Sequence, residues 1–258
     1  MFYGITISKL IFVSLAMFLA GFIDSIAGGG GLISLPAYLL SGLNATVAFA
    51  CNKTSACLGT AVATYKYFKG GKINIPVAII SSVFGIIGAY YAAKILLSLN
   101  PIFLQKVIVC VIPFIALFLI LKKDFGSENN FASVPKSKVW IASILFGFIL
   151  GLYDGLIGPG TGTFAMMFFT LILKFDLKTA SGNARLFNLC AAIGSIIYYL
   201  TSNVIVWPIV LITAFADILG NYIGSSLALK KNTSFIRIVM IVVVATLLIK
   251  LGYDTFIA

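Results

Sequence analysis

The chain has 258 residues, of which 61% are hydrophobic and only 10% are charged, and its mean hydropathy is +1.12. Soluble domains contain about 45–50% apolar and about 25% charged residues, so this composition indicates an integral membrane protein. The chain contains no histidine, which excludes histidine-based catalysis and histidine-ligated metal sites. The net charge of +11 does not require a nucleic-acid partner, because the cations flank apolar runs where the positive-inside bias and anionic lipid account for them.

Eight apolar groups, each near the roughly 20 residues that cross a hydrocarbon core of about 30 Å, predict an all-α polytopic membrane protein. In chain order they cover residues 9–27 with a short continuation 32–40, then 45–65, 76–97, 103–121, 139–157 with a continuation 163–173, 179–200, 204–229 and 235–251. The polar stretch 122–138 is predicted to be a cytoplasmic linker between a first transmembrane repeat, 1–121, and a second, 139–258. The two interrupted groups are both broken by glycine.

The two halves resemble each other in sequence. The string GFIDSIAGGGG begins at Gly21, and GLYDGLIGPGTG begins at Gly151. Equivalent residues follow in the same order, namely Asp24 and Asp154, Lys53 and Arg185, Pro76 and Pro208, Gly88 and Gly220. One shared glycine would mean little, but an ordered series of this kind indicates an internal repeat. Gly88 with Ala92, and Gly220 with Gly224, are also spaced for close packing of membrane helices.

The distribution of basic residues favours an inverted repeat. If each interrupted segment crossed the membrane once, the loop cations would divide nine to seven. If each were a re-entrant hairpin, each half would make three full crossings and the division would be twelve to four. The positive-inside rule prefers the second arrangement, which places both termini outside the cytoplasm. The twelve predicted cytoplasmic cations are Lys66, Lys69, Lys72, Lys122, Lys123, Lys136, Lys138, Lys174, Lys178, Lys230, Lys231 and Arg237.

Each interruption predicts a cavity inside the membrane. The first comprises Gly28, Gly29, Gly30 and Gly31, and the second comprises Gly158, Pro159, Gly160, Thr161 and Gly162. Exposed backbone polar groups are costly in hydrocarbon, so irregular backbone persists there only beside protein or water. A helix that restarts after such a break presents free N–H groups and a positive dipole end, which favour an anion. The alternative is that the glycines only allow helices to cross closely.

Charged residues within the membrane are costly and generally mark a site. Five are predicted to lie there: Asp24, Lys53, Asp154, Arg185 and Asp217. Asn52 beside Lys53, and Asn188 near Arg185, add amide groups. We therefore expect the two cations, their amide neighbours and the two glycine breaks to form one binding site for an anion.

The two repeated aspartates have a second interpretation, compatible with the first. Asp24 with Lys53, and Asp154 with Arg185, would form one salt bridge within each half and hold the repeats in register. Asp24 and Asp154 are then expected to compensate the cations of the empty site, or to take up a coupling proton when an anion arrives, because burial and a nearby like charge favour the neutral acid.

The segments GFIDSIAGGGGLISLP, CNKTSA, GLYDGLIGPGTG and GNARLFN resemble the signature segments of the TauE/SafE family of membrane transporters, and the resemblance extends through both halves. It implies a transporter in a prokaryotic inner membrane that moves small anions such as sulfite, sulfonates and other organosulfur anions. Motif positions of the family are matched by Gly28 to Gly31, Asn52, Lys53, Gly158 to Gly160, Arg185 and Asn188. Arg185 stands where a lysine is common, and Thr161-Gly162 departs from the triple glycine of many relatives.

These features together predict a secondary carrier in which two repeats alternate access to a central anion site. The sequence has no GxxxxGKS/T motif and no CxxC pair, so neither ATP hydrolysis nor a metal or other cofactor is expected. No enzyme is expected either, because the GxGD motif of intramembrane aspartyl proteases is missing. The alternatives are an anion channel and a membrane scaffold that transports nothing. The expected partners are a small anion and membrane lipid, without nucleic acid.

Reporter fusions test the predicted orientation. A reporter that is active only outside the cytoplasm should be active when fused after Ala258 and inactive when inserted into the linker 122–138, because the linker is flanked by the predicted cytoplasmic cations. Enzyme activity in whole cells is the measurement, and a second reporter that is active only in the cytoplasm serves as the control at both positions. The reverse pattern would contradict the inverted repeat.

Overall fold

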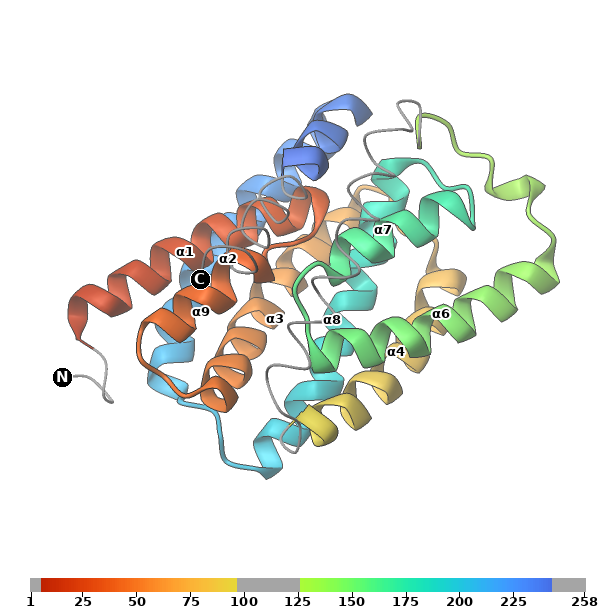
Figure 1. Ribbon diagram of the computed structural model, residues 1–258. Coiled ribbons are helices and arrows are strands. Elements are labelled where there is room, and N and C mark those ends of the chain that lie inside the picture. The colour runs from red at the N-terminus through yellow and green to blue at the C-terminus, as the bar shows by residue number, and fades with distance from the viewer. Residues whose placement is uncertain (1–5, 97–125, 243–258) are drawn as a thin grey trace, which may run out of the picture.

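The structure, a computed structural model, describes residues 6–96 and 126–242, which are mostly helical and include no strand (Figure 1). The first half contains α1 (Ile7–Ala27), α2 (Gly31–Leu40), α3 (Ala45–Lys69) and α4 (Ile75–Leu96). The second half contains a 3₁₀ turn (Phe131–Ser133), α6 (Lys136–Leu156), α7 (Thr161–Leu171), α8 (Leu177–Thr201), α9 (Trp207–Lys230) and a helix Thr233–Val242. The all-α prediction is confirmed for these residues. The predicted span 103–121 and the end of the span 235–251 lie outside the described residues.

The central helix of each half begins with the same kind of cap. The side chain of Asn44 accepts a hydrogen bond from the Val47 N–H at the start of α3, over 2.9 Å. The carboxylate of Asp176 accepts from the Lys178 and Thr179 N–H groups at the start of α8, over 3.0 and 3.1 Å. Asn and Asp at this position satisfy N–H groups that the helix itself leaves free, so both long helices start at a residue that the sequence specifies.

Both interrupted segments are pairs of helices that fold back on themselves. At the end of α2, the carbonyl of Ser41 accepts from Nζ of Lys9, which lies at the start of α1, over 3.0 Å. Just after α7, the carbonyl of Lys174 accepts from the N–H of Asn130, which lies shortly before α6, over 2.9 Å. With 10 and 11 residues, α2 and α7 are about 15–17 Å long and too short to cross a hydrocarbon core of about 30 Å. Each pair is therefore a hairpin whose ends lie on the same side.

The two halves pack by exchanging contacts. The long arm of the first hairpin, α1, lies against α9 of the second half, whereas the long arm of the second hairpin, α6, lies against α4 of the first half (Figure 1). A Cβ added to Gly220 would fall 2.1 Å from the carbonyl oxygen of Phe18, and one added to Gly88 would fall 2.4 Å from that of Phe148. These repeat-equivalent glycines thus allow the two helix pairs to cross at backbone contact, as their spacing predicted.

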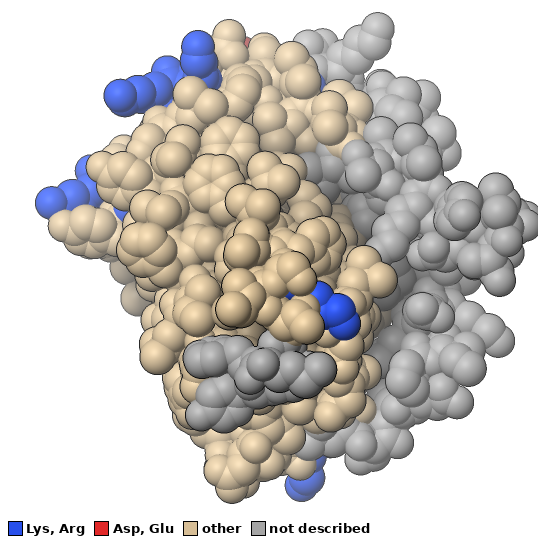
Figure 2. Space-filling view, turned by 90° about the vertical axis from the view of Figure 1, so that its left-hand side faces the viewer, with Lys and Arg blue, Asp and Glu red and all other residues tan. Residues whose placement is uncertain are grey.

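Apolar side chains cover the outside of the helices. Five described helices, namely α1, α4, α6, α8 and α9, are long and apolar enough to cross a membrane. On α1 the exposed side chains at one helical spacing are Ile11, Leu15 and Leu19, and on α9 Phe215 is 65% exposed. Figure 2 shows the side of the molecule that carries α1 and α9, where uncharged side chains dominate and only a few basic ones are visible. This surface fits a hydrocarbon solvent, and the protein is a membrane protein.

Replacing the crossing glycines should destabilise the fold. Gly220→Ala and Gly88→Ala each push a methyl group into a carbonyl oxygen, and we expect each to lower the free energy of unfolding by about 1–3 kcal/mol. The measurement is the thermal unfolding midpoint of protein purified in detergent, with the folded fraction after heating determined by size-exclusion chromatography. Leu219→Ala is the matched control on α9, because Leu219 is 42% exposed and faces outward. Unchanged unfolding midpoints in both glycine variants would mean that these crossings are not as close as described.

Candidate functional site

The tips of the two hairpins meet in the middle of the molecule. Gly28, Gly29, Gly158 and Gly160 have φ angles of +80°, +91°, +79° and +88°, a region that side chains disfavour. A Cβ on Gly28 would lie 2.3 Å from the backbone nitrogen of Thr163, whose hydroxyl donates to the Ala27 carbonyl over 3.1 Å. The two glycine breaks, far apart in sequence, are therefore in direct backbone contact.

A cavity of about 80 Å³ lies beside this contact. Its wall includes residues from both breaks and from α3, α8 and α9. Of the predicted site residues, the wall contains Asp24, Gly29, Gly30, Asn52, Lys53, Asp154, Gly158, Pro159, Gly160 and Asn188. About 10–15 Å³ of such space holds one water molecule, so the cavity has room for a small ion.

Two predicted site residues lie behind the cavity wall. Gly28 is buried in the contact between the hairpin tips. Arg185 is fully buried behind two residues of the cavity wall, Asp24 and Gly162. Its guanidinium pairs with Asp24, and its Nη2 would lie 2.5 Å from a Cβ added to Gly162. Arg185 therefore supplies positive charge and orients the wall, whereas Lys53 lies in the wall itself.

The ion pairs connect the two halves, which corrects the predicted pairing. Lys53 pairs with Asp154, with Nζ 2.6 Å from Oδ2, and Arg185 pairs with Asp24. The expected partners were Asp24 for Lys53 and Asp154 for Arg185. The prediction was wrong because the two hairpin tips lie against each other, so that each aspartate at the base of a break faces the cation of the other half. A repeat in the sequence shows which residues are equivalent. It does not show how they pair, because pairing within each half and pairing between the halves are equally symmetric.

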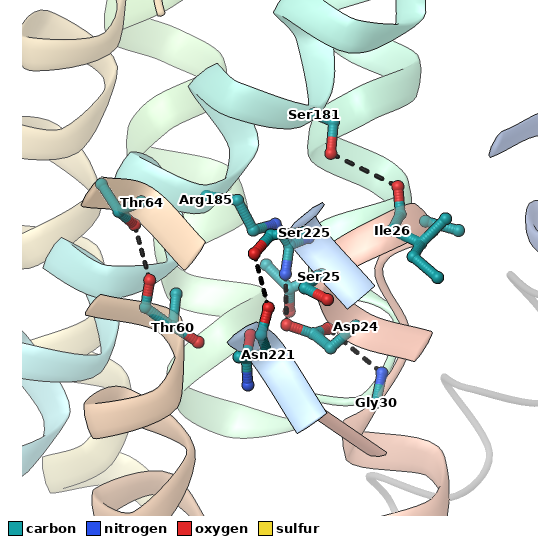
Figure 3. Close-up of polar contacts among 12 residues, drawn as sticks. Asp24, Ser25, Ile26, Gly30, Thr60, Thr64, Ser181, Arg185, Asn221 and Ser225 are labelled. Atoms are coloured by element: carbon teal, nitrogen blue, oxygen red, sulfur yellow. Dashed lines mark hydrogen bonds and ion pairs between the residues drawn. The ribbon is translucent and has the colours of Figure 1, made fainter. Parts of the chain in front are cut away.

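The two breaks differ in the polar groups that lie near the start of the second helix of the hairpin. The N-cap residues of α2 and α7 are Gly30 and Gly160, which have no side chain to cap the helix. The carboxylate of Asp24 nevertheless lies at the start of α2, where Oδ1 accepts from the Gly30 N–H over 3.1 Å while Oδ2 pairs with Arg185 (Figure 3). At the second break the Tyr153 hydroxyl donates to the Pro159 carbonyl over 2.8 Å. A carboxylate therefore already occupies the positive end of α2, which favours negative charge.

Several buried polar atoms at the site have no hydrogen-bond partner among the described residues. They are Oδ1 of Asn52, Oδ1 of Asn188, Oδ1 of Asn221, and Nε and Nη2 of Arg185. Leaving a buried polar group unpaired costs about 1–3 kcal/mol, and more for a charged group. Asn188 Nδ2 would also lie 3.0 Å from a Cβ on Gly162, so an amide donor stands beside the second break. These unused groups around one cavity are what a polar ligand would satisfy.

The structure adds two residues that the sequence did not assign to the site. Asp217 and Asn221, one turn apart on α9, lie in the cavity wall beside Asp24 and Lys53. Asp217 was recognised as an intramembrane charge, but the repeat offered no support for it, because its equivalent position in the first half is Gly85. The spacing Asp-x-x-x-Asn on a predicted membrane helix was the available signal.

Comparisons with known proteins agree with one another. The family model described as "Sulfite exporter TauE/SafE" matches residues 13–251. "Probable membrane transporter protein ORF9" of Sinorhizobium sp. is 30% identical over 95% of this chain and 93% of its own length. "Probable membrane transporter protein YfcA" of Escherichia coli K12 is 31% identical over 92% and 87%, and "Probable membrane transporter protein YdhB" of Bacillus subtilis is 23% identical over 83% and 88%. No solved structure matches the chain significantly.

A double-mutant cycle tests the crossed ion pairs. Asp154→Asn combined with Lys53→Gln should show a coupling energy of about 0.5–3 kcal/mol, because either single change leaves a buried charge without its partner. The control cycle combines Asp154→Asn with Arg185→Gln, where the two effects should add within about 0.5 kcal/mol. Unfolding by sodium dodecyl sulfate in mixed micelles supplies the free energies. Stronger coupling in the control cycle would restore the pairing within each half.

Proposed function

Because the chain belongs to the sulfite exporter TauE/SafE family, we propose that it is a secondary transporter of small anions, with sulfite and sulfonate-type organosulfur anions as the substrate class. One observation carries this proposal. A single small cavity is walled by both glycine breaks, contains Lys53, and is surrounded by buried polar groups without partners. The relatives named as membrane transporters match nearly the whole chain, so the same architecture is shared. No catalytic step is proposed for any residue of the cavity.

The anion binds by replacing the carboxylate of Asp154 as the partner of Lys53. Asp154 neutralises Lys53, and Asp24 neutralises Arg185. A tetrahedral or pyramidal oxyanion that enters beside Gly158 takes the place of the Asp154 carboxylate at Lys53 Nζ, which lies 3.7 Å from the Cβ position of Gly158. The amide groups of Asn52 and Asn188 turn their NH₂ ends toward it. Gly29, Gly30, Pro159 and Gly160 complete the wall with backbone, and Gly28 allows the tips to meet.

Alternating access by two inverted repeats is the mechanism that this packing supports. The hairpins point their tips toward each other, and equivalent helices exchange contacts between the halves. A site at the meeting point of two such repeats opens to one side when the repeats rock one way and to the other side when they rock back. Both halves carry a cation and an aspartate there, so the charge environment is similar in either orientation.

The proposed location is a prokaryotic cell membrane, with both termini outside the cytoplasm. The end of α3, the start of α8 and the end of α9 lie together: Lys66 Nζ donates to the Tyr222 carbonyl, and Lys178 Nζ to the Leu229 carbonyl, both over 3.0 Å. The linker joins this end, because the Leu177 N–H donates to the Gly126 carbonyl over 3.0 Å. The positive-inside rule then makes this basic end cytoplasmic.

Exchange of radiolabelled sulfite in proteoliposomes tests the proposed function. We expect saturable counterflow with the unmodified protein. Lys53→Gln combined with Asp154→Asn should lower the exchange rate at least tenfold, because the charge-assisted hydrogen bond from Lys53 to the anion contributes about 1.5–3 kcal/mol. Because the double variant removes both members of the ion pair, it leaves no buried charge without a partner and should still fold. Lys138→Gln, which removes an exposed cation near the start of α6, is the matched control and should exchange normally.

Three results would contradict the proposal. Flux that never saturates and shows no counterflow indicates a channel. No flux of sulfite, taurine or sulfoacetate with correctly folded protein indicates a scaffold that transports nothing. Normal exchange by the double variant places the anion elsewhere than at Lys53.

A further inference from the structure

A third carboxyl group lies in the cavity wall without a cation. Asp217 on α9 is 2% exposed. Glycines on two neighbouring helices make room for it: a Cβ on Gly59 of α3 would fall 1.9 Å from Oδ2, and one on Gly21 of α1 would fall 2.5 Å from Oδ1. Neither ion pair of the described residues includes Asp217. The fold thus holds a carboxyl group at a depth where an unpaired negative charge is costly.

The neighbour of Asp217 suits both of its protonation states. Nδ2 of Asn221 donates to Oδ2 of Asp217 over 3.0 Å, and Oδ1 of Asn221 has no partner among the described residues (Figure 3 shows Asn221). The amide NH₂ donates to an ionised carboxylate, and it donates equally to the carbonyl oxygen that a protonated carboxyl group keeps. Asn221 can therefore satisfy Asp217 with or without a proton.

The charges around the cavity show why a proton is needed. Those that face Asp217 from the elements around it are Asp24 of α1, Lys53 and Cys57 of α3, Arg185 of α8 and the hydroxyl of Tyr38 in α2. The remaining charge in the wall is Asp154, which pairs with Lys53. Two cations are thus balanced by Asp24 and Asp154, and an ionised Asp217 would give the cavity a net charge of −1. An arriving anion would add to this negative charge in a medium of low dielectric constant.

We propose that Asp217 is the proton-binding site that couples the movement of the anion to that of a proton. This inference rests on the proposed function and adds its coupling ion. Asp217 binds a proton when the anion enters and releases it when the anion leaves, so the two cross the membrane in the same direction. Asp24 stays paired with Arg185, and Asp154 neutralises Lys53 until the anion takes its place there. The position of Gly85 in the first half shows that the repeat itself does not require a carboxyl group here.

Proteoliposomes with a pH gradient test this coupling. With the unmodified protein, a gradient of about one pH unit should drive accumulation of radiolabelled sulfite by up to about tenfold, as expected for one proton per anion. Asp217→Asn keeps the shape of the side chain, and its sulfite counterflow without a gradient is the reference against which its accumulation is compared. Accumulation driven by the pH gradient should be lost, and counterflow should depend less on pH. Glu128→Gln is the matched control, because Glu128 is exposed and is not among the residues that line the cavity.

The outcomes separate this inference from the proposed function. If the unmodified protein shows no counterflow, the proposed function fails, and the coupling fails with it. If counterflow is present but Asp217→Asn still accumulates sulfite in response to the pH gradient as the unmodified protein does, only the role of Asp217 is overturned. Sulfite is itself a weak acid, so the comparison is always between the unmodified protein and the variant under the same gradient.

Chemical labelling supplies a readout that needs no variant. Dicyclohexylcarbodiimide is apolar and reacts with protonated carboxyl groups within membranes. When sulfite is present, mass spectrometry of peptides from the unmodified protein should find the adduct on Asp217 and not on Asp24 or Asp154, which pair with Arg185 and Lys53. Labelling of Asp24 or Asp154 with Asp217 unmodified would overturn the proposal.

Discussion

Backbone that leaves the helical pattern inside a membrane must be enclosed, and the rest of this structure follows from that constraint. Each glycine break is covered by the tip of the other hairpin, where the Thr163 hydroxyl and the Ala27 carbonyl connect the two. Because the tips meet, the long arm of each hairpin packs against a helix of the opposite half, and glycines such as Gly88 and Gly220 allow these helices to cross closely. The small cavity remains beside the contact because two breaks built of glycine and proline cannot fill the space with side chains.

Charge at this depth is balanced between the halves. The aspartate of each break pairs with the cation of the other half. Each ion pair therefore neutralises two buried charges and also holds a hairpin to the central helix of the opposite half. Breaking one pair would leave a buried charge exposed to low dielectric, at a cost of about 3–5 kcal/mol. An anion that replaces one carboxylate keeps the cation paired but releases the carboxylate, and in the proposed mechanism this exchange links binding to the movement of the repeats.

The symmetry of the site is incomplete in ways that bear on its chemistry. Asp24 occupies the start of α2, whereas the second break holds hydroxyl contacts and lies nearest to Lys53. Arg185 is fully buried, but Lys53 lies in the wall. Asp217 has no counterpart in the first half. Two similar repeats therefore provide the frame and the paired charges, while one added carboxyl group supplies the site that we assign to a proton.

The sequence by itself determined the membrane class, the helices, the two glycine breaks and the equivalence of Lys53 with Arg185, because hydropathy, glycine runs and repeats are local patterns. Of the twelve residues that it assigned to the site, ten line the cavity. Only the tertiary structure decided which aspartate faces which cation, that Arg185 stands behind the wall, and that Asp217 and Asn221 belong to the cavity. These are contacts between segments more than a hundred residues apart, and a repeat leaves them open because pairing within a half and pairing across the halves have the same symmetry.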